Sequence, residues 1–373
     1  MREKLLDFLA CPDCRQKLDL VVFDSESGGE ILTGLLHCEK NHYFPIAGGI
    51  PRMLPSSLKD YWPEIKAKIS PSSASKVVRD LLENASLNQQ TKDYDTRTKA
   101  NFSNEWDHHD IGGRTWTMEL DDRVQWYFLD SIRIAKEDLK GKVMLDAGCG
   151  NGSQSVAYTE FGLEVIAVDL STGLEKGYAF RQVHQRARPE NVHFIQGDLQ
   201  NPPLAPDSFD IIHSAGVLHH TPNTEKTFRA LRPLLKSGGT FYVWLYKYEN
   251  VVTPIVNTMR AVTTRIPAPV FARLADAMSF PFIGFCWTVN KLGLRKYETP
   301  DRREAALAVH DIFGAPYAHY HSYEEVSGWY NSVGIAEIWP CNDDRRGFGV
   351  CGRMPAEKSA ENSSAATGGG GGA

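Results

Sequence analysis

The segment from Val143 to Ser153, which reads VMLDAGCGNGS, constrains the fold more than any other stretch of this chain. Its first half is a short apolar run with the β-prone residues of a buried strand. Its second half carries Gly148, Gly150 and Gly152, which predict a turn that opens a helix. Because glycine lacks a Cβ, a ligand can lie against bare backbone there, and the helix N-terminus directs free N–H groups toward it. The stretch therefore predicts a ligand site between a strand and a helix.

The spacing of the glycines indicates which class of ligand the turn binds. A dinucleotide-binding turn needs G-x-G-x-x-G, whereas this turn reads G-x-G-x-G, with Asp146 two residues before the first glycine. An ordinary glycine-rich turn between strand and helix is the other alternative. The pattern resembles motif I of the class I S-adenosylmethionine (SAM) methyltransferases. That resemblance implies that the three glycines hold SAM, that Asp146 helps to hold its ammonium group, and that Cys149 packs beside it as a small residue.

An acidic residue follows each of the next two predicted strands. The strand over residues 164–169 ends at Asp169, about twenty residues past the glycines, where a carboxylate can accept hydrogen bonds from the ribose hydroxyls of SAM. Leu170 beside it is included in the predicted cofactor site. The strand over residues 193–198 ends at Asp198, which resembles the family position that contacts the adenine amine. The alternatives are a charge that caps a strand and an aspartate in a turn.

Leu199, after the third strand, and Ser214, at the end of the fourth, complete the predicted cofactor site. The segment after Ser214 lies where the reactive methyl group should meet its acceptor, and it resembles the quinone-methylating and small-molecule branch of the family. His220, or else His219, is predicted as a general base because imidazole titrates near working pH. The alternative is that these histidines pack or orient the loop, since this kind of methyl transfer depends first on alignment.

The remaining pattern completes a Rossmann-like α/β sheet, and the family closes such a sheet with an antiparallel last strand. Gly238 and Gly239 are predicted to end a helix. The resemblance covers residues 140–246 and, less closely, residues 323–354. Further helices are predicted over 174–187, 224–235 and 323–333, and further strands over 239–246, 336–341 and 347–354.

Near the start, two pairs of metal-binding residue types stand a hairpin's length apart. Cys11 and Cys14 form a C-x2-C pair, and Cys38 and His42 form a C-x3-H pair. Together they predict a closed, structural zinc site, because about 50 residues bury too little core to be stable unaided. His37 is a rival fourth ligand, and reduced thiols without metal are the alternative.

Residues 1–54 resemble the zinc-binding domains of tRNA methyltransferase activator subunits and of ribosomal RNA guanine methyltransferases, through these pairs and the following segment YFPIAGGIP. We therefore expect a zinc-binding β module that is followed by the methyltransferase domain. The expected divisions are a module over 1–54, a linker and surface helix over 55–100, a methyltransferase domain over 101–354 with a helical insertion over 247–322, and a disordered tail over 355–373.

The insertion is apolar, above all across residues 251–290, and three interpretations stay open. It is a lid that closes on an apolar acceptor, a peripheral membrane contact, or a packing or dimer surface. An aromatic segment over 101–116 is either a cap over the site or a helix packed against the sheet. The oligomeric state stays open.

Composition limits the partners and the compartment. The net charge of −5 disfavours nucleic acid as a partner. No secretory signal pattern and no uncharged run of about 18 residues is present. Seven cysteines, three of them clustered near the start, favour a reducing, cytoplasmic location.

The sequence therefore predicts an enzyme that transfers a methyl group from SAM to oxygen, nitrogen or carbon of a small acceptor, lipid-like or sugar-derived. One alternative is an RNA base methyltransferase, which should show a basic path from the zinc module to the cleft. Another is a SAM-binding adaptor without turnover.

Overall fold

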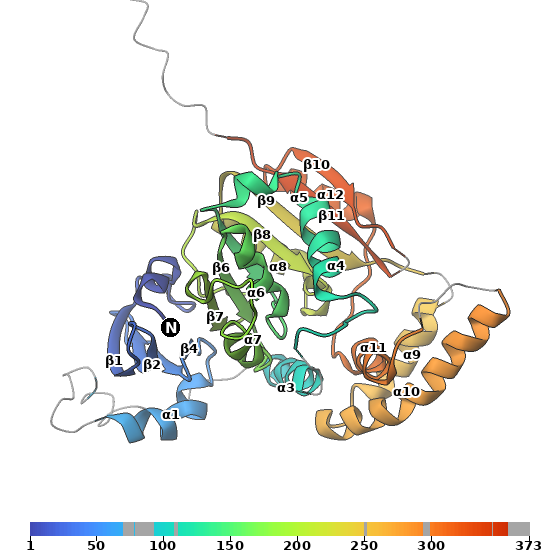
Figure 1. Ribbon diagram of the computed structural model, residues 1–373, viewed down its shortest axis with the longest axis horizontal. Helices are drawn as coiled ribbons and strands as arrows, with labels where there is room; N and C mark the ends of the chain where they lie inside the picture. Colours follow the sequence, from blue (N-terminus) through green and yellow to red (C-terminus); the bar gives the residue numbers. More distant parts are fainter. Residues whose placement is uncertain are drawn as a thin grey trace, which may run out of the picture.

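A computed structural model describes residues 1–69, 78, 93–107, 111–249, 252–293, 299–344 and 346–356. Its main element is a seven-stranded sheet with the order β10-β11-β9-β8-β5-β6-β7 (Figure 1). Neighbours from β9 to β7 pair in parallel, and β11 runs antiparallel to both of its neighbours. The predicted α/β sheet with an antiparallel last strand is confirmed. Its strands are β5 (Val143–Ala147), β6 (Glu164–Asp169), β7 (Val192–Gln196), β8 (Phe209–Ala215), β9 (Leu235–Tyr246), β10 (Glu337–Cys341) and β11 (Gly347–Arg353).

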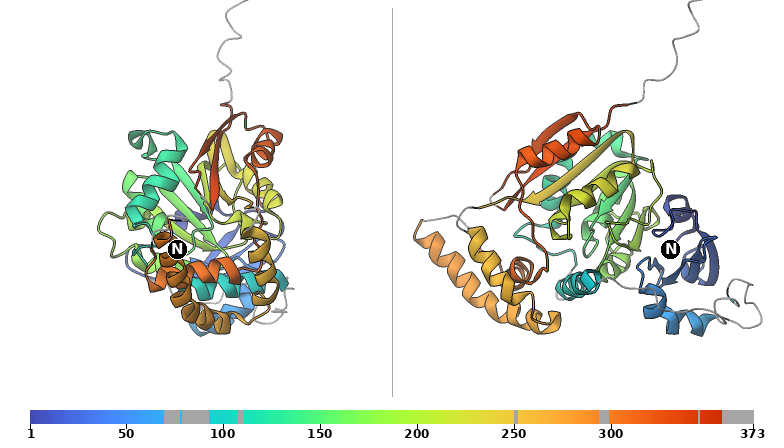
Figure 2. Two further views of the ribbon diagram at one scale, coloured as in Figure 1. Left: turned by 90° about the vertical axis from the view of Figure 1, so that its right-hand side faces the viewer. Right: turned by 180° about the vertical axis from the view of Figure 1, so that it is seen from behind.

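The parallel strands are buried on both faces because helices cover both sides. In β6, Ile166 and Val168 join one hydrophobic cluster, while Val165 and Ala167 join another, as the two-residue period of a strand requires. Figures 1 and 2 show the two helical layers. One layer holds α4 (Leu120–Val124), α5 (Asp130–Ile132), α6 (Ser153–Tyr158) and α7 (Leu174–Phe180), and the other holds α8 (Thr224–Leu231) and α12 (Tyr323–Ser332).

Two predicted helix ends were wrong. The helix that starts at Leu174 stops at Phe180, seven residues before the predicted end. Gly238 and Gly239 do not cap α8. They lie inside β9, where the pairing with β8 jumps irregularly from Leu235 to Thr240. Of the linker and surface helix expected over 55–100, residues 70–92 fall outside the described residues except for Val78, and so does the predicted tail from residue 357 onward.

The N-terminal module is a four-stranded antiparallel sheet that covers an edge of the large one. Met53 donates its backbone N–H to the Gln196 carbonyl of β7 at 2.7 Å, and Leu9 bridges to Leu204. An edge strand that would otherwise expose its backbone is thereby paired. The module consists of β1 (Asp19–Ser25), β2 (Ile31–His37), β3 (Tyr43–Ala47) and β4 (Ile50–Pro51), with α1 (Ser57–Lys68) packed on β3. Helix α1, at the start of the expected linker, therefore lies against the module.

A third group of helices lies beyond the carboxyl ends of the parallel strands (Figures 1 and 2). Its α9 is fastened to the end of α11 by Arg260, which donates to the Ile312 carbonyl at 3.0 Å and to the Ala315 carbonyl. A cation at the carbonyl end of a helix is favourable. The group comprises α3 (Asp93–Asp107), α9 (Val252–Thr263), α10 (Ala268–Lys291) and α11 (Arg302–Gly314).

Among the described residues, α10 is the one helix that is long and apolar enough, by length and composition, to cross a membrane. The search of the sequence for a long run without charged residues missed α10, because Arg273 and Asp276 interrupt its apolar residues. Core helices of other proteins meet the same length and composition test, so the property alone assigns no membrane span.

A buried ionic cluster joins the module to the methyltransferase half. The Glu30 carboxylate accepts from the Met1 ammonium at 2.7 Å, from Arg181 at 3.1 Å and from the Tyr178 hydroxyl at 3.0 Å. Burial opposes ionisation of Glu30, but the ammonium and Arg181 outweigh it and lower the pKa of Glu30 from 4.5 to about 2. Buried charges need such partners, so the cluster fixes how the two halves meet.

We expect Glu30→Gln to make the free energy of unfolding less dependent on pH at acidic pH. A carboxylate with a lowered folded-state pKa adds stability that is complete above 4.5 and is lost as the pH falls toward about 2. Burial lowers the pKa of the Met1 ammonium from 8.0 to about 6, so this partner is fully charged only below that pH. The glutamine does not titrate, so the gap in urea midpoint between the two proteins should be largest between about 4.5 and about 6 and should shrink on further acidification. Glu26→Gln, at an exposed position, is the control. Parallel curves for Glu30→Gln and the unmodified protein would contradict the assignment.

Candidate active site and metal centre

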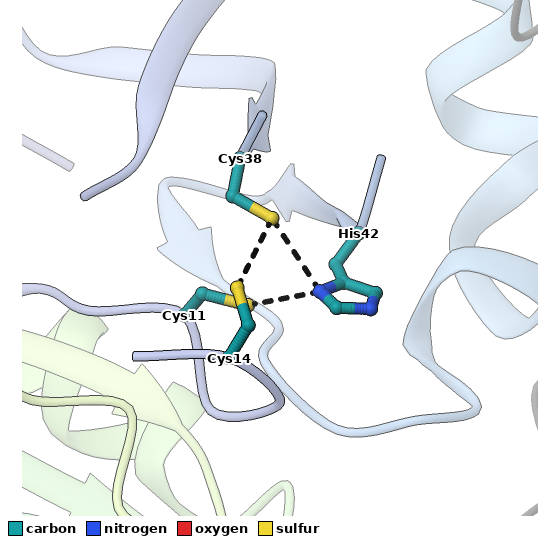
Figure 3. A group of neighbouring side chains, drawn as sticks. All are labelled: Cys11, Cys14, Cys38 and His42. Atoms are coloured by element: carbon teal, nitrogen blue, oxygen red, sulfur yellow. Dashed lines mark hydrogen bonds between the residues drawn. The ribbon is translucent and has the colours of Figure 1, made fainter. Parts of the chain in front are cut away.

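Four metal-binding side chains of the N-terminal module converge (Figure 3). Their ligand atoms all lie within 4.8 Å of one another: the sulfurs of Cys11, Cys14 and Cys38 and the imidazole of His42. The His42 Nδ1 lies 3.3 Å from the Cys11 Sγ and 3.4 Å from the Cys38 Sγ, and the Cys14 and Cys38 sulfurs are 3.6 Å apart. The predicted ligand set is thus brought together, while the rival His37 lies outside it, at the end of β2.

This arrangement fits zinc. Zinc–sulfur bonds of about 2.3 Å in a tetrahedron place ligand atoms about 3.8 Å apart, close to the distances observed. Three thiolates and one imidazole close the coordination sphere, so a bound zinc ion would hold two turns together and leave no position for a reactive water. Cys11 and Cys14 come from the turn that precedes β1, and Cys38 and His42 from the turn between β2 and β3.

A cavity of about 1200 Å³ opens at the carboxyl ends of β5 to β8 and extends to α9, α10 and α11. Many predicted site residues line it, namely Gly148, Cys149, Gly150, Asp169, Leu170, Asp198, Leu199 and His220. Four do not: Asp146, Gly152, Ser214 and His219. The cavity also includes Phe102, Trp106 and Trp116, in agreement with the aromatic cap.

The glycine turn is held in place by the second strand. One Asp169 oxygen accepts the Gly150 N–H at 2.8 Å, and the other accepts the Ser171 N–H and hydroxyl at 2.8 and 2.7 Å. Burial raises the pKa of Asp169, and these hydrogen bonds oppose the rise. Gly150 has φ +57°, and a Cβ there would lie 2.7 Å from the ring of Trp106. Only glycine therefore fits between the turn and this aromatic wall.

The predicted residues outside the cavity have structural contacts instead. Asp146 is turned inward, where its carboxylate accepts the Ser155 hydroxyl at 2.6 Å and faces His213 at 3.7 Å. The expected contact of Asp146 with the ammonium group of SAM stays a prediction. A Cβ on Gly152 would lie 2.6 Å from Phe194, so this glycine serves close packing. The Ser214 hydroxyl donates to the Ala147 carbonyl at 2.8 Å and joins two strands.

The two neighbouring histidines differ sharply. His219 is fully buried and stacks on Tyr246 with ring centroids 3.8 Å apart. Burial, and then the adjacent His220, hold the pKa of His219 well below 6.5, so it stays neutral and packs rather than exchanges protons. His220 lines the cavity. Its Nδ1 lies 2.8 Å from the Tyr317 carbonyl, and its Nε2 lies 3.2 Å from the Asp311 carboxylate.

Sequence reasoning missed the acids that come from outside the core motifs. Asp311, on α11, faces His220 and accepts the Tyr246 hydroxyl. Its pKa is lowered: burial raises it, but His220 and Tyr246 more than compensate. Glu105, on α3, lies 3.2 Å from His310, and burial raises the pKa of Glu105. No short-range signal marks these residues, because their partners are distant along the chain.

The fold and the site together define a class I SAM-dependent methyltransferase domain: a glycine turn follows β5, acids follow β6 and β7, and β11 is antiparallel. Comparison with known families agrees. Residues 145–243 match the family described as methyltransferase domain, and residues 2–49 match the family described as Trm112p-like protein. The recognition of both parts from their motifs is confirmed.

Curated relatives match over the methyltransferase core. Ubiquinone biosynthesis O-methyltransferase of Pseudomonas fluorescens is 32% identical over 32% of this chain and 48% of its own length. Demethylmenaquinone methyltransferase of Renibacterium salmoninarum is 33% identical over 28% and 40%. Sterol 24-C-methyltransferase ERG6B of Gibberella zeae is 30% identical over 30% of each chain. The chain spans less than half the length of these relatives.

We expect Cys14→Ser to lower the bound zinc from about one equivalent per chain and to lower the thermal midpoint, because one of four ligands is lost. Elemental analysis and a melting curve with and without chelator measure both effects. His37→Asn is the matched control and should keep its metal. Equal zinc in Cys14→Ser and the unmodified protein would disprove the ligand assignment.

We expect Asp169→Ala to weaken SAM binding by about 1.5 kcal/mol or more, roughly tenfold in Kd, since it removes charge-assisted hydrogen bonds and the anchor of Gly150. Calorimetric titration with SAM gives the affinity. Asp138→Ala, an exposed aspartate near the start of β5, should bind as the unmodified protein does. A folded Asp169→Ala protein with unchanged affinity would rule out this role.

Proposed function

We propose that the protein transfers the methyl group of SAM to a small amphiphilic acceptor. The observation that carries the proposal is that one cavity joins the cofactor turn to an apolar compartment formed by α9, α10 and α11. Small-molecule sites usually measure about 300–1,000 Å³, so 1200 Å³ is room for SAM and a second molecule together. Apolar lining side chains of this compartment include Val256, Phe282, Val289, Ile312 and Phe313.

The polar end of the acceptor belongs near His220. This histidine follows β8, at the sheet edge where the glycine turn also lies, whereas Asp311 approaches from the insertion. Tyr246 adds a hydroxyl to the same group. A molecule with a polar head and an apolar body would match this distribution of polar and apolar lining.

His220 is suited to accept the proton of an acceptor hydroxyl. Its Nδ1 must carry a proton to donate to the Tyr317 carbonyl, which leaves Nε2 as the atom that gains one. As the acceptor oxygen attacks the methyl carbon, the carbon–sulfur bond breaks, its electron pair passes to sulfur, and the hydroxyl proton is taken up by the His220–Asp311 pair. The Asp311 carboxylate, 3.2 Å away, then stabilises the imidazolium.

Three of the named relatives support an apolar acceptor. One is named for ubiquinone biosynthesis, one for demethylmenaquinone and one for sterols. Another relative is a tRNA U34 carboxymethyltransferase from Desulfotalea psychrophila, 31% identical over 28% of this chain. RNA is therefore included among the substrates to be tested. The apolar compartment and the net charge of −5 favour the small molecule.

To test the proposal, the purified protein is incubated with radiolabelled SAM and a cellular lipid extract, and separately with radiolabelled SAM and total RNA. We expect label in the organic phase. His220→Asn and Asp311→Asn should lower kcat, His220→Asn about 100-fold, with an unchanged Kd for SAM. His319→Asn, whose side chain does not line the cavity, is the control. Label in RNA would replace the proposal with RNA methylation, and SAM binding without any labelled product would favour an adaptor.

A further inference from the structure

The exposed apolar side chains of this protein are concentrated on the insertion. Ten of the thirteen large apolar residues that are exposed among the described residues lie between Val252 and Leu292. On α9, Ile255, Met259 and Val262 recur at helical spacing, with 57%, 41% and 66% of their surfaces exposed. Monomeric soluble proteins rarely gather exposed apolar residues in this way without a partner.

The same surface leads into the cavity. Ile255, Met259 and Phe285 line the cavity and are also exposed, the last at 55%. The apolar compartment therefore reaches the outside between α9 and α10. A surface that served packing alone would have no need to be continuous with the substrate compartment.

The charge of the insertion opposes that of the whole chain. Residues 251–303 contain eight lysines and arginines against three acids, in a chain with net charge −5. Two of these cations flank exposed aromatic rings: the Lys291 ammonium lies 4.7 Å from the Trp287 ring, and the Arg302 guanidinium lies 5.0 Å from the Phe280 ring. Aromatic rings with neighbouring cations are typical of the boundary between lipid headgroups and acyl chains.

We propose that the exposed face of α9 and α10 docks on an anionic lipid bilayer, and that the acceptor enters the cavity from it. The entry route rests on the proposed function, whereas the docking does not. Helix α10 lies on the surface rather than spanning it, because Phe271 and Ala275 are buried against α11 and α3, and Arg273 and Asp276 interrupt its apolar residues. Apolar burial and attraction to anionic headgroups would act together.

Cosedimentation of the full chain with lipid vesicles tests the docking, with no SAM or acceptor present. We expect binding to vesicles of phosphatidylcholine and phosphatidylglycerol in equal parts, weaker binding to phosphatidylcholine alone, and weakening by salt. The double variant Phe280→Ser, Trp287→Ser should bind at least about tenfold less. Neither residue lines the cavity, and Val183→Ser, at an exposed valine outside the insertion, is the matched control.

Three outcomes would overturn the docking. These are no binding to anionic vesicles, equal binding by the double variant and the control, and a dimer in analytical ultracentrifugation that the double variant dissociates. The last would assign the face to a second copy of the chain. Equal melting curves establish that the variants are folded. Because the assay involves no methyl transfer, failure here leaves the proposed reaction intact, and loss of methyl transfer would leave the docking intact.

Discussion

Two adjacent residues of α11 fix the insertion to the rest of the molecule. His310 pairs with Glu105 of α3, and Asp311 pairs with His220 after β8, so two imidazole–carboxylate pairs join one turn of α11 to two other parts of the chain. All four side chains are buried, and a buried charge without its partner would cost several kcal/mol. The pairs therefore permit one placement of α11. Because α9 and α10 pack on α11, that placement shapes the apolar compartment.

The two sides of the large sheet are completed by different means. Beside β7, the backbone of the zinc module forms hydrogen bonds with the backbone of the sheet. The hydrophobic core of the module is also continuous with the core on one face of the sheet. Beyond the end of β9, side chains of the insertion line one side of the cavity. The first arrangement is well suited to stability, since paired backbone and a closed metal site leave little freedom. The second leaves an opening, which an acceptor site requires.

The parts that could be predicted from the sequence are those whose physics is local. The glycine turn and its order relative to the strands set the fold, because glycine spacing and two-residue alternation depend on near neighbours. The spacing of Cys11, Cys14, Cys38 and His42 likewise predicted a cluster that the structure brings together. The failures were long-range. The helix from Leu174 ends early, and the contacts of Asp146 with Ser155 and His213 could not be read from the sequence. The role of Asp311 depends on helix packing that no local pattern specifies.

The division of the cavity has a consequence for specificity. The cofactor end is built largely from backbone and short side chains at strand ends, where Asp169 and Gly150 constrain each other and substitutions are poorly tolerated. The end proposed for the acceptor is lined by large apolar side chains of α9, α10 and α11, which are not part of the sheet. Changes there can alter the size and polarity of the compartment without disturbing the cofactor turn. In the proposed function, the insertion therefore selects the acceptor and the sheet binds the cofactor, and His220 and Asp311 lie where these two parts of the cavity meet.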